Sequence, residues 1–146
     1  MKTVTFGYNT FYIIPTTIVI SIAIISLCIT ACTLDDPEQW MIFIVAAVII
    51  GSITRFFTLN YFIPMVKKKP ALLLNDEKIV SFVSDTMLYW KEIAKVEKYG
   101  VLSYTYFLFE LNNGELVRIS TKWVEGSDSV IYYNIQQFYA SALKSN

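Results

Sequence analysis

The acidic residues of this chain are few, and their spacing does not suit catalysis. Asp35, Asp36 and Glu38 lie in one short polar segment and could bind a divalent cation weakly through their carboxylate oxygens. Asp76 and Glu77 are adjacent, and successive side chains of an extended segment point to opposite sides, so they are unsuited to act as a carboxylate pair. We interpret the first group as a marker of membrane topology and expect no metal site.

The bases and nucleophiles that enzymes use most are also sparse in the sequence. The chain has no histidine, which removes the commonest general base and the usual partner of a catalytic serine or cysteine. Cys28 and Cys32 are four residues apart in an apolar run, unlike a C-x-x-C redox pair, and we interpret them as small apolar side chains. The five glycines form neither a P-loop nor a dinucleotide-binding fingerprint. We therefore expect a protein that is not an enzyme and binds no cofactor.

The charges are balanced in number but uneven in position. Lys and Arg total 12, as do Asp and Glu, and this lack of a basic excess argues against nucleic-acid binding. Hydrophobic residues make up 55% of the chain and charged residues 16%, which is more apolar than a typical soluble domain. Residues 3–34 carry no charge and residues 39–66 carry only Arg55. This distribution predicts a membrane half followed by a water-soluble half.

Two apolar runs, residues 11–34 and 40–66, are long enough to cross a membrane. Residues 13–32 alone number twenty, about the length that spans a bilayer core as a helix. The polar segment DDPEQ, residues 35–39, separates the runs. Because lipid-exposed backbone must satisfy its own hydrogen bonds, we predict a transmembrane helical hairpin over residues 1–69.

Basic residues flank this hairpin and acidic residues occupy its loop. Lys2 precedes the first span, and Lys67, Lys68 and Lys69 follow the second. The positive-inside rule then places both termini in the cytoplasm and the loop outside. The three lysines either anchor the second helix at the headgroups or recognise anionic lipid, at about 1 kcal/mol per lysine.

Arg55 and four small residues are candidate contacts within the membrane. An arginine inside a span is a functional hypothesis by default, although Arg55 can also snorkel to the cytoplasmic headgroups. Ser26 and Thr30 are one helical turn apart, as are Ala47 and Gly51, and such small residues let helices approach closely. The contact could form within the hairpin, in a homo-oligomer or with a foreign membrane helix.

Residues 70–146 predict an antiparallel β-domain that ends in a helix. Asp76-Glu77 and the segment NNG, residues 112–114, are turn signals between runs that are rich in β-branched, aromatic and other apolar residues. Apolar residues then recur at helical spacing, which predicts an amphipathic helix over residues 129–144. Strands followed by one helix make an α+β pattern. We expect the strands at residues 71–75, 78–83, 87–90, 91–99, 104–111 and 115–121, and the helix face at Ile131, Ile135, Phe138 and Ala142.

Aromatic residues are frequent in this half of the chain. Most of them should pack in the core, and any that remain exposed together would form a binding surface, because Tyr and Trp are enriched at interface hot spots. The candidates for such a protein-binding surface are Trp90, Trp123, Tyr104 and Tyr106.

The segments KKKPALLLNDEKI and LYWKEIAKVE, an aromatic strand, the NNG turn and the final helix together resemble a pleckstrin-homology-like (PH-like) domain. The whole chain is similar to a family of small two-pass bacterial inner-membrane proteins that carry such a domain in the cytoplasm. The resemblance implies an α+β membrane protein with a PH-like domain over residues 70–146. That segment is short for the fold, so we expect one strand to be missing or merged.

The resemblance also bears on function, because related architectures occur among bacterial immunity proteins. We expect a non-enzymatic, membrane-anchored binding protein, most concretely one that neutralises a toxin acting at the inner membrane. Two alternatives remain open. One is an adaptor that senses lipid or envelope stress at the cytoplasmic leaflet, and the other is an oligomeric transporter or channel subunit with Arg55 lining its path.

Overall fold

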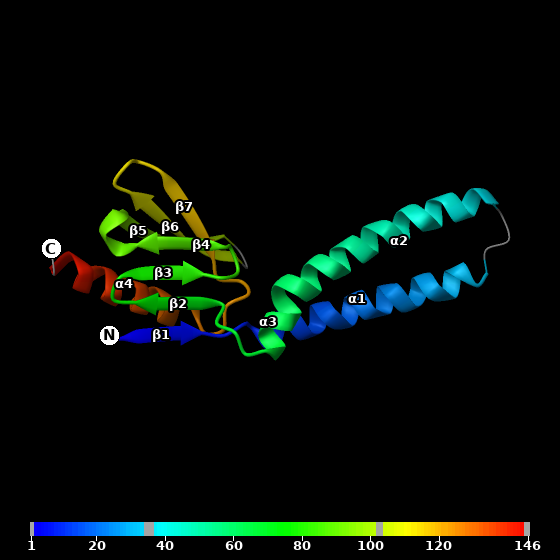
Figure 1. Ribbon diagram of the computed structural model, residues 1–146, viewed down its shortest axis with the longest axis horizontal. Coiled ribbons are helices and arrows are strands. Elements are labelled where there is room, and N and C mark those ends of the chain that lie inside the picture. The colour runs from blue at the N-terminus through cyan, green and yellow to red at the C-terminus, as the bar shows by residue number, and fades with distance from the viewer. Residues whose placement is uncertain (1, 34–36, 102–103, 145–146) are drawn as a thin grey trace.

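The chain folds into a long helical hairpin attached to a β-domain (Figure 1). The computed structural model describes residues 2–33, 37–101 and 104–144, without the side chains of residues 37, 38, 101 and 104. Asp35, Asp36 and the side chain of Glu38 therefore lie outside the described part. The fold is α+β, as the sequence predicts.

Two long apolar helices, α1 and α2, form the hairpin. By length and composition alone, both are able to cross a membrane. α2 continues through a π-helical turn, η1, into the short helix α3, so one nearly continuous rod leads back to the β-domain (Figure 1). The bounds are Thr10–Ala31 for α1, Pro37–Phe57 for α2, Thr58–Phe62 for η1 and Ile63–Val66 for α3.

Seven strands form two antiparallel sheets in the described part of the chain. Strands β1 to β4 make a four-stranded sheet in the order β1-β2-β3-β4, and strands β5 to β7 make a three-stranded sheet in the order β5-β6-β7. A 3-10 turn, η2, joins the sheets, and helix α4 follows the last strand. The bounds are Thr3–Phe6 (β1), Leu72–Asn75 (β2), Lys78–Ser81 (β3), Thr86–Tyr89 (β4), Trp90–Glu92 (η2), Ile93–Val101 (β5), Tyr104–Leu111 (β6), Leu116–Ser120 (β7) and Asp128–Lys144 (α4).

The N-terminal strand β1 belongs to the β-domain. Thr3 pairs with Asn75 and Phe6 with Leu72, so β1 forms one edge of the four-stranded sheet. The predicted domain boundary, which placed residues 1–69 in the hairpin, is therefore wrong for this strand. β1 is four residues long, uncharged and followed closely by an apolar run, so hydropathy merges it with α1. The hairpin is consequently an insertion between β1 and β2.

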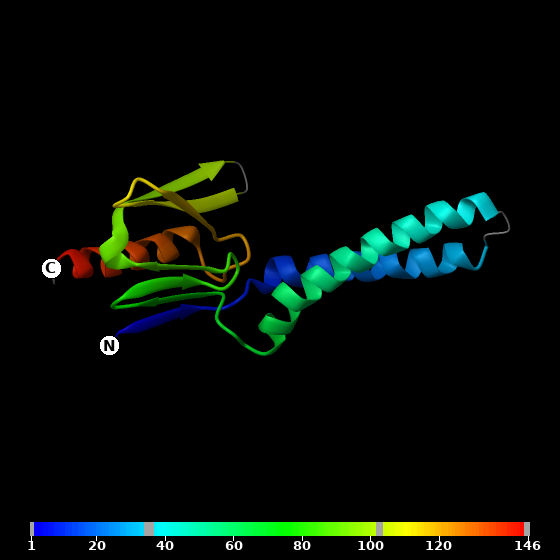
Figure 2. The same ribbon diagram turned by 45° about the horizontal axis from the view of Figure 1, so that its top comes forward.

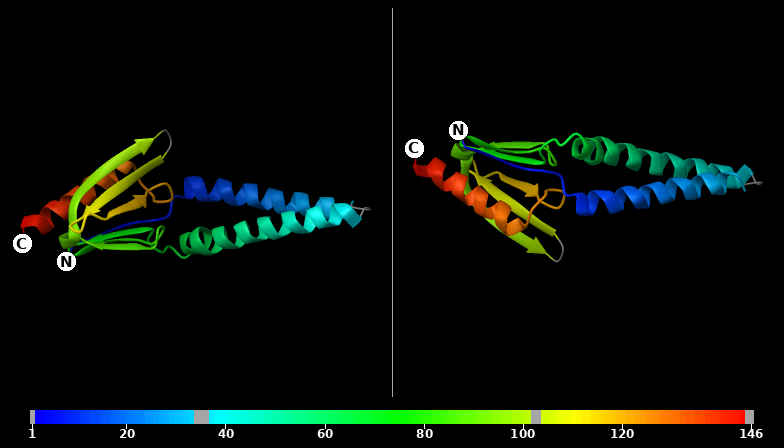
Figure 3. Two further views of the ribbon diagram at one scale, coloured as in Figure 1. Left: turned by 90° about the horizontal axis from the view of Figure 1, so that it is seen from above. Right: turned by 90° about the horizontal axis from the view of Figure 1, so that it is seen from below.

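Helix α4 lies along the open side between the two sheets (Figure 2, Figure 3). Its buried face consists of Ile131, Ile135 and Phe138, which confirms the predicted amphipathic helix. On the side of the three-stranded sheet, the hydroxyl of Tyr139 donates a hydrogen bond to the carbonyl of Ala94 at 2.7 Å. One helix therefore seals a core to which both sheets contribute.

Trp90 is part of this core. Its side chain is only 2% exposed, its ring stacks on Phe138 with centroids 6.3 Å apart, and its Nε1 donates a hydrogen bond to the carbonyl of Asn75 at 2.7 Å. A buried indole usually needs such a partner for its N–H. Trp90 is thus no part of an exposed protein-binding surface, contrary to its place among the sequence candidates.

Strand β1 should be required for a stable β-domain. A soluble fragment of residues 70–146 would lose the whole pairing with β2 and the packing of Val4 and Phe6 on the core, at a cost of about 2–4 kcal/mol. We expect its urea midpoint, followed by circular dichroism, to lie well below that of a matched fragment in which residues 2–9 are joined by a Gly/Ser linker to residues 67–146. Equal midpoints would show that β1 is dispensable.

Candidate functional site

An aromatic cluster joins the hairpin to the β-domain. Trp123, in the segment between β7 and α4, has its ring centroid 6.3 Å from Tyr12 of α1, 5.9 Å from Phe57 of α2 and 4.8 Å from Tyr61 of η1. Phe57 is 7% exposed, so the end of α2 is covered at this point. We call these four residues the Trp123 joint. It contacts both arms of the hairpin and therefore fixes their position relative to the domain.

Backbone hydrogen bonds also connect the hairpin to the β-domain beside the Trp123 joint. The amide of Asn9 donates to the carbonyl of Trp123 at 2.8 Å, and the amide of Glu125 donates to the carbonyl of Gly7 at 2.8 Å. Between them, Tyr8 pairs with Val124 in an antiparallel bridge. The Asn9 Oδ1 caps α1 by accepting a hydrogen bond from the amide of Phe11 at 3.0 Å. The chain passes from sheet to helix without a flexible linker.

A groove of about 560 Å³ runs between α1 and α2. Ala47 and Gly51, two of the predicted contact residues, line it, together with Arg55 at the end nearer the domain. The remaining lining is mostly apolar: Ile24, Leu27, Cys28, Ala31, Phe43, Ile50, Thr54, Thr58 and Leu59.

Ser26 and Thr30 do not mark a contact between the two helices. Both side chains are exposed, and neither lines the groove. The hydroxyl of Thr30 donates to the carbonyl of Ser26 in its own helix at 2.9 Å, so it needs no partner from α2. The prediction is therefore wrong for a contact within the hairpin, whereas a contact of this pair with a second copy or a foreign membrane helix stays a prediction.

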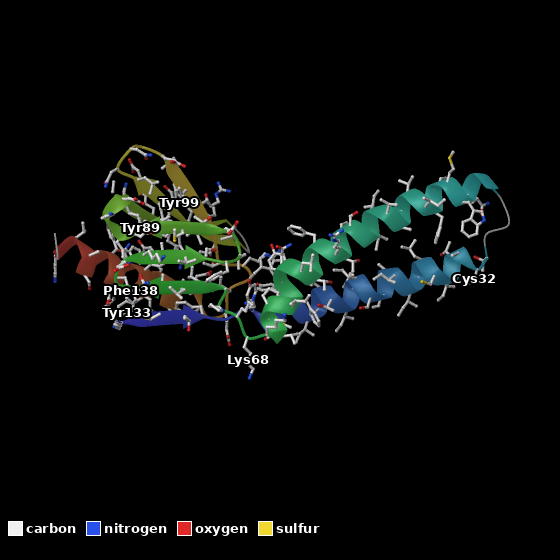
Figure 4. The ribbon with its side chains drawn as sticks, in the orientation of Figure 1. Cys32, Lys68, Tyr89, Tyr99, Tyr133 and Phe138 are labelled. Carbon is white, nitrogen blue, oxygen red and sulfur yellow. The ribbon has the colours of Figure 1, made fainter. Side chains whose placement is uncertain are left out.

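The three lysines end the rod formed by α2, η1 and α3. The amide of Lys69 donates to the carbonyl of Pro64 at 2.9 Å and that of Lys68 to the carbonyl of Met65 at 3.0 Å, the pattern of a Schellman C-cap. Lys68 stands at the left-handed position with φ 51°, where glycine is usual. All three side chains are exposed, and Figure 4 shows Lys68 pointing away from the protein at the junction.

Exposed and half-buried polar and aromatic side chains form a second cluster on the three-stranded sheet, with Tyr99 and Arg118 exposed and Glu97 and Tyr106 half-buried. The rings of Tyr99 (labelled in Figure 4) and Tyr106 stack with centroids 5.6 Å apart, and the Arg118 guanidinium lies 4.2 Å from the centroid of the Tyr106 ring. The Tyr99 hydroxyl donates to Glu97 at 2.6 Å. We call Glu97, Tyr99, Tyr106 and Arg118 the tyrosine face. Of the predicted surface residues, Tyr106 lies here, whereas the side chain of Tyr104 lies outside the described residues.

Hydrogen bonding fixes the charge state of this face. Lys95 and Tyr99 both donate to Glu97, and these bonds, that of Lys95 first, hold the pKa of the Glu97 carboxyl below its ordinary value of 4.5. The bond to Glu97 likewise raises the pKa of the Tyr99 phenol. At neutral pH the face therefore presents an ionised Glu97 carboxylate, paired with Lys95, beside the neutral phenol of Tyr99.

Sequence reasoning found only part of these sites. Glu97, Tyr99 and Arg118 were missed because their contacts cross three strands, although Glu97 and Tyr99 share the alternate spacing of one strand face. Among the described residues, no group of three or more acidic or cysteine side chains could hold a metal ion. No family model, curated protein or solved structure matches this chain.

The Schellman cap leads to a stability prediction. Lys68→Gly should stabilise the protein by about 0.5–1 kcal/mol, because glycine adopts a positive φ without strain. The matched control is Lys67→Gly, which removes the same charge at φ −77° and should destabilise by a similar amount. Thermal unfolding of the full chain in detergent should therefore shift in opposite directions. A shift of the same sign in both variants would mean that the lost charge, and not the backbone conformation, determines the change in stability.

The tyrosine face leads to a prediction about pH. Tyr99→Phe removes one hydrogen bond to Glu97 and should raise the pKa of that carboxyl toward 4.5, which NMR titration of its carboxyl carbon would measure. Because the folded pKa lies below the unfolded one, the stability that Glu97 contributes is present at neutral pH and lost as pH falls through the folded pKa. Tyr133→Phe, on α4, is the control and should leave Glu97 unchanged. An unshifted Glu97 in Tyr99→Phe would contradict the hydrogen bond.

Proposed function

We propose that this chain is a non-enzymatic binding protein of the bacterial inner membrane, with a two-pass anchor and a cytoplasmic PH-like domain. Four- and three-stranded antiparallel sheets closed by a C-terminal helix support the PH-like assignment. Strand β1 supplies the strand that residues 70–146 lack by themselves. The domain is thus built from both ends of the chain around its anchor.

The lengths of the helices support the two-pass anchor. α1 has 22 residues and α2 has 21, each about 32 Å long at about 1.5 Å per residue. The hydrocarbon core of a bilayer is about 30 Å thick. η1 and α3 would then lie at the headgroup level beside the Trp123 joint, and the exposed lysines 67–69 would face the cytoplasmic leaflet.

The observation that carries the proposal is the double attachment of the domain. A tether needs one connection, whereas this hairpin leaves the sheet after β1, returns at β2 and packs on Trp123 with both arms. Such an anchor holds the faces of the domain in fixed positions relative to the bilayer. Fixed presentation is useful for binding a partner that arrives at the membrane, because it reduces the entropy lost on association.

The tyrosine face is the candidate contact for a protein partner. Tyrosine and arginine are enriched at interface hot spots, and here the stacking and the bond to Glu97 hold both tyrosine rings in place before any partner binds. In the most concrete version of the proposal, the partner is a toxin that acts at the inner membrane and the chain is its immunity protein.

A lipid adaptor is the second candidate function. The exposed lysines 67–69 end the hairpin, and the turn after β3 lies at the end of the domain next to it (Figure 1). This turn carries Phe82, which is 49% exposed and whose amide donates to the carbonyl of Ala71 at 2.9 Å. A basic cluster beside an exposed aromatic ring suits an anionic membrane surface.

Affinity purification of the tagged full-length chain from its native cells in mild detergent, followed by mass spectrometry, tests the proposal. We expect one protein partner in stoichiometric amount. Tyr106→Ala should weaken its retention about five- to thirtyfold, corresponding to about 1–2 kcal/mol at a hot spot. Tyr133→Ala, the same truncation at a tyrosine on α4 that is 63% exposed, should retain the partner. Recovery of the chain with anionic lipid alone would contradict protein binding and favour the adaptor.

A further inference from the structure

Arg55 has no counter-ion among the described residues of the hairpin. Residues 3–34 and 39–66 contain no Asp or Glu, and in the described part of the chain the Arg55 side chain makes no ion pair. The side chain is exposed and lines the α1–α2 groove. A charge beside a hydrocarbon surface is costly unless it is paired or hydrated. The pairing group, if there is one, must come from another molecule.

The groove is lined in the manner of a lipid site. Among the described residues that line it, Arg55 is the single charged one, and it stands toward the domain end, two residues before Phe57 of the Trp123 joint. The hydroxyl of Thr54 donates to the carbonyl of Ile50 in its own helix at 2.7 Å, so it adds little free polarity. From Arg55 to Phe43 the wall runs about 18 Å along α2, close to the ~15 Å of hydrocarbon in one leaflet.

The length of the groove suits an extended acyl chain. Its wall on α2 runs about 24 Å from Phe43 to Leu59. A helix with its side chains is about 10 Å across, whereas an acyl chain is much narrower and can lie along the groove between α1 and α2. A second copy of α1 or α2 packed against the groove is the competing occupant, and the test below distinguishes it from a lipid.

We propose that the α1–α2 groove binds one anionic phospholipid of the surrounding bilayer, with an acyl chain along the groove and the phosphate on Arg55. The inference rests on the proposed membrane anchor, because only a hairpin in a bilayer meets such a lipid. A guanidinium forms strong, bidentate hydrogen bonds with phosphate, and the negative headgroup complements the single positive charge of the groove. The lipid would fill the space that α1 and α2 leave between them.

Native mass spectrometry of the full-length protein tests this inference. The protein is reconstituted with equal amounts of phosphatidylglycerol and phosphatidylcholine of matched acyl chains and released into mild detergent. We expect one retained lipid and about a fivefold preference for phosphatidylglycerol. Arg55→Gln should abolish the preference and leave a lipid bound, because the apolar groove remains.

Blocking the groove provides the second arm of the test. A Cβ added at Gly51 meets nothing within 4 Å, so Gly51→Leu should place its side chain in the groove and abolish retention. The matched control is Ser52→Leu, which adds a similar side chain on an exposed position outside the groove and should retain the lipid. If Gly51→Leu fails to fold by circular dichroism, Ala47→Leu takes its place.

Three results would overturn the inference. They are a preference that survives Arg55→Gln, equal retention in Gly51→Leu and Ser52→Leu, and a protein dimer in place of the lipid adduct. Flotation of the chain with vesicles measures membrane insertion of the hairpin independently of lipid retention in the groove. A chain that floats but retains no lipid overturns only this inference, whereas a chain that does not float also contradicts the proposed function.

Discussion

The backbone ladder between residues 7–9 and 123–125 is the interaction on which the rest of the structure depends. Asn9 is its central residue, because its amide bonds to Trp123 of the domain while its side chain caps α1. One residue thus ends the domain and begins the helix. With no linker between them, the direction of α1 follows from the geometry of the sheet, and the Trp123 joint then brings α2 to the same place.

This arrangement makes the hairpin and the domain depend on each other during folding. β1 and β2 are paired strands, yet the entire hairpin separates them in sequence. The entropy of closing a long flexible loop opposes such a pairing. A hairpin that is already formed brings its two ends together, so residues 6 and 71 meet at a lower entropic cost. The order of events that the topology favours is helices first and the edge strand last.

Sequence reasoning succeeded where the signal was local. The two helices, the turn at Asp76-Glu77 and the amphipathic face of α4 follow from patterns within a few residues, and the structure has all three. β1 was missed because its only distinguishing feature is its partner β2, far along the chain. Trp90 stands among the candidates for a binding surface because composition cannot tell a buried indole from an exposed one. Trp90 can be buried because the fold brings the carbonyl of Asn75 to the indole N–H.

The contacts that orient the domain are apolar or backbone contacts, and this sets how the molecule responds to its surroundings. Exposed charges such as Lys67–Lys69 interact over about a Debye length, roughly 8 Å at physiological ionic strength, and salt weakens them. The ring contacts of the Trp123 joint and the ladder at Asn9 do not involve such charges, and the ammonium of Lys122 at the joint contacts the Trp123 ring itself, 5.2 Å from its centroid. Changes in ionic strength therefore alter how strongly the lysines attract anionic surfaces without tilting the domain. The tyrosine face therefore keeps its position relative to the hairpin under every ionic condition in which the fold is intact.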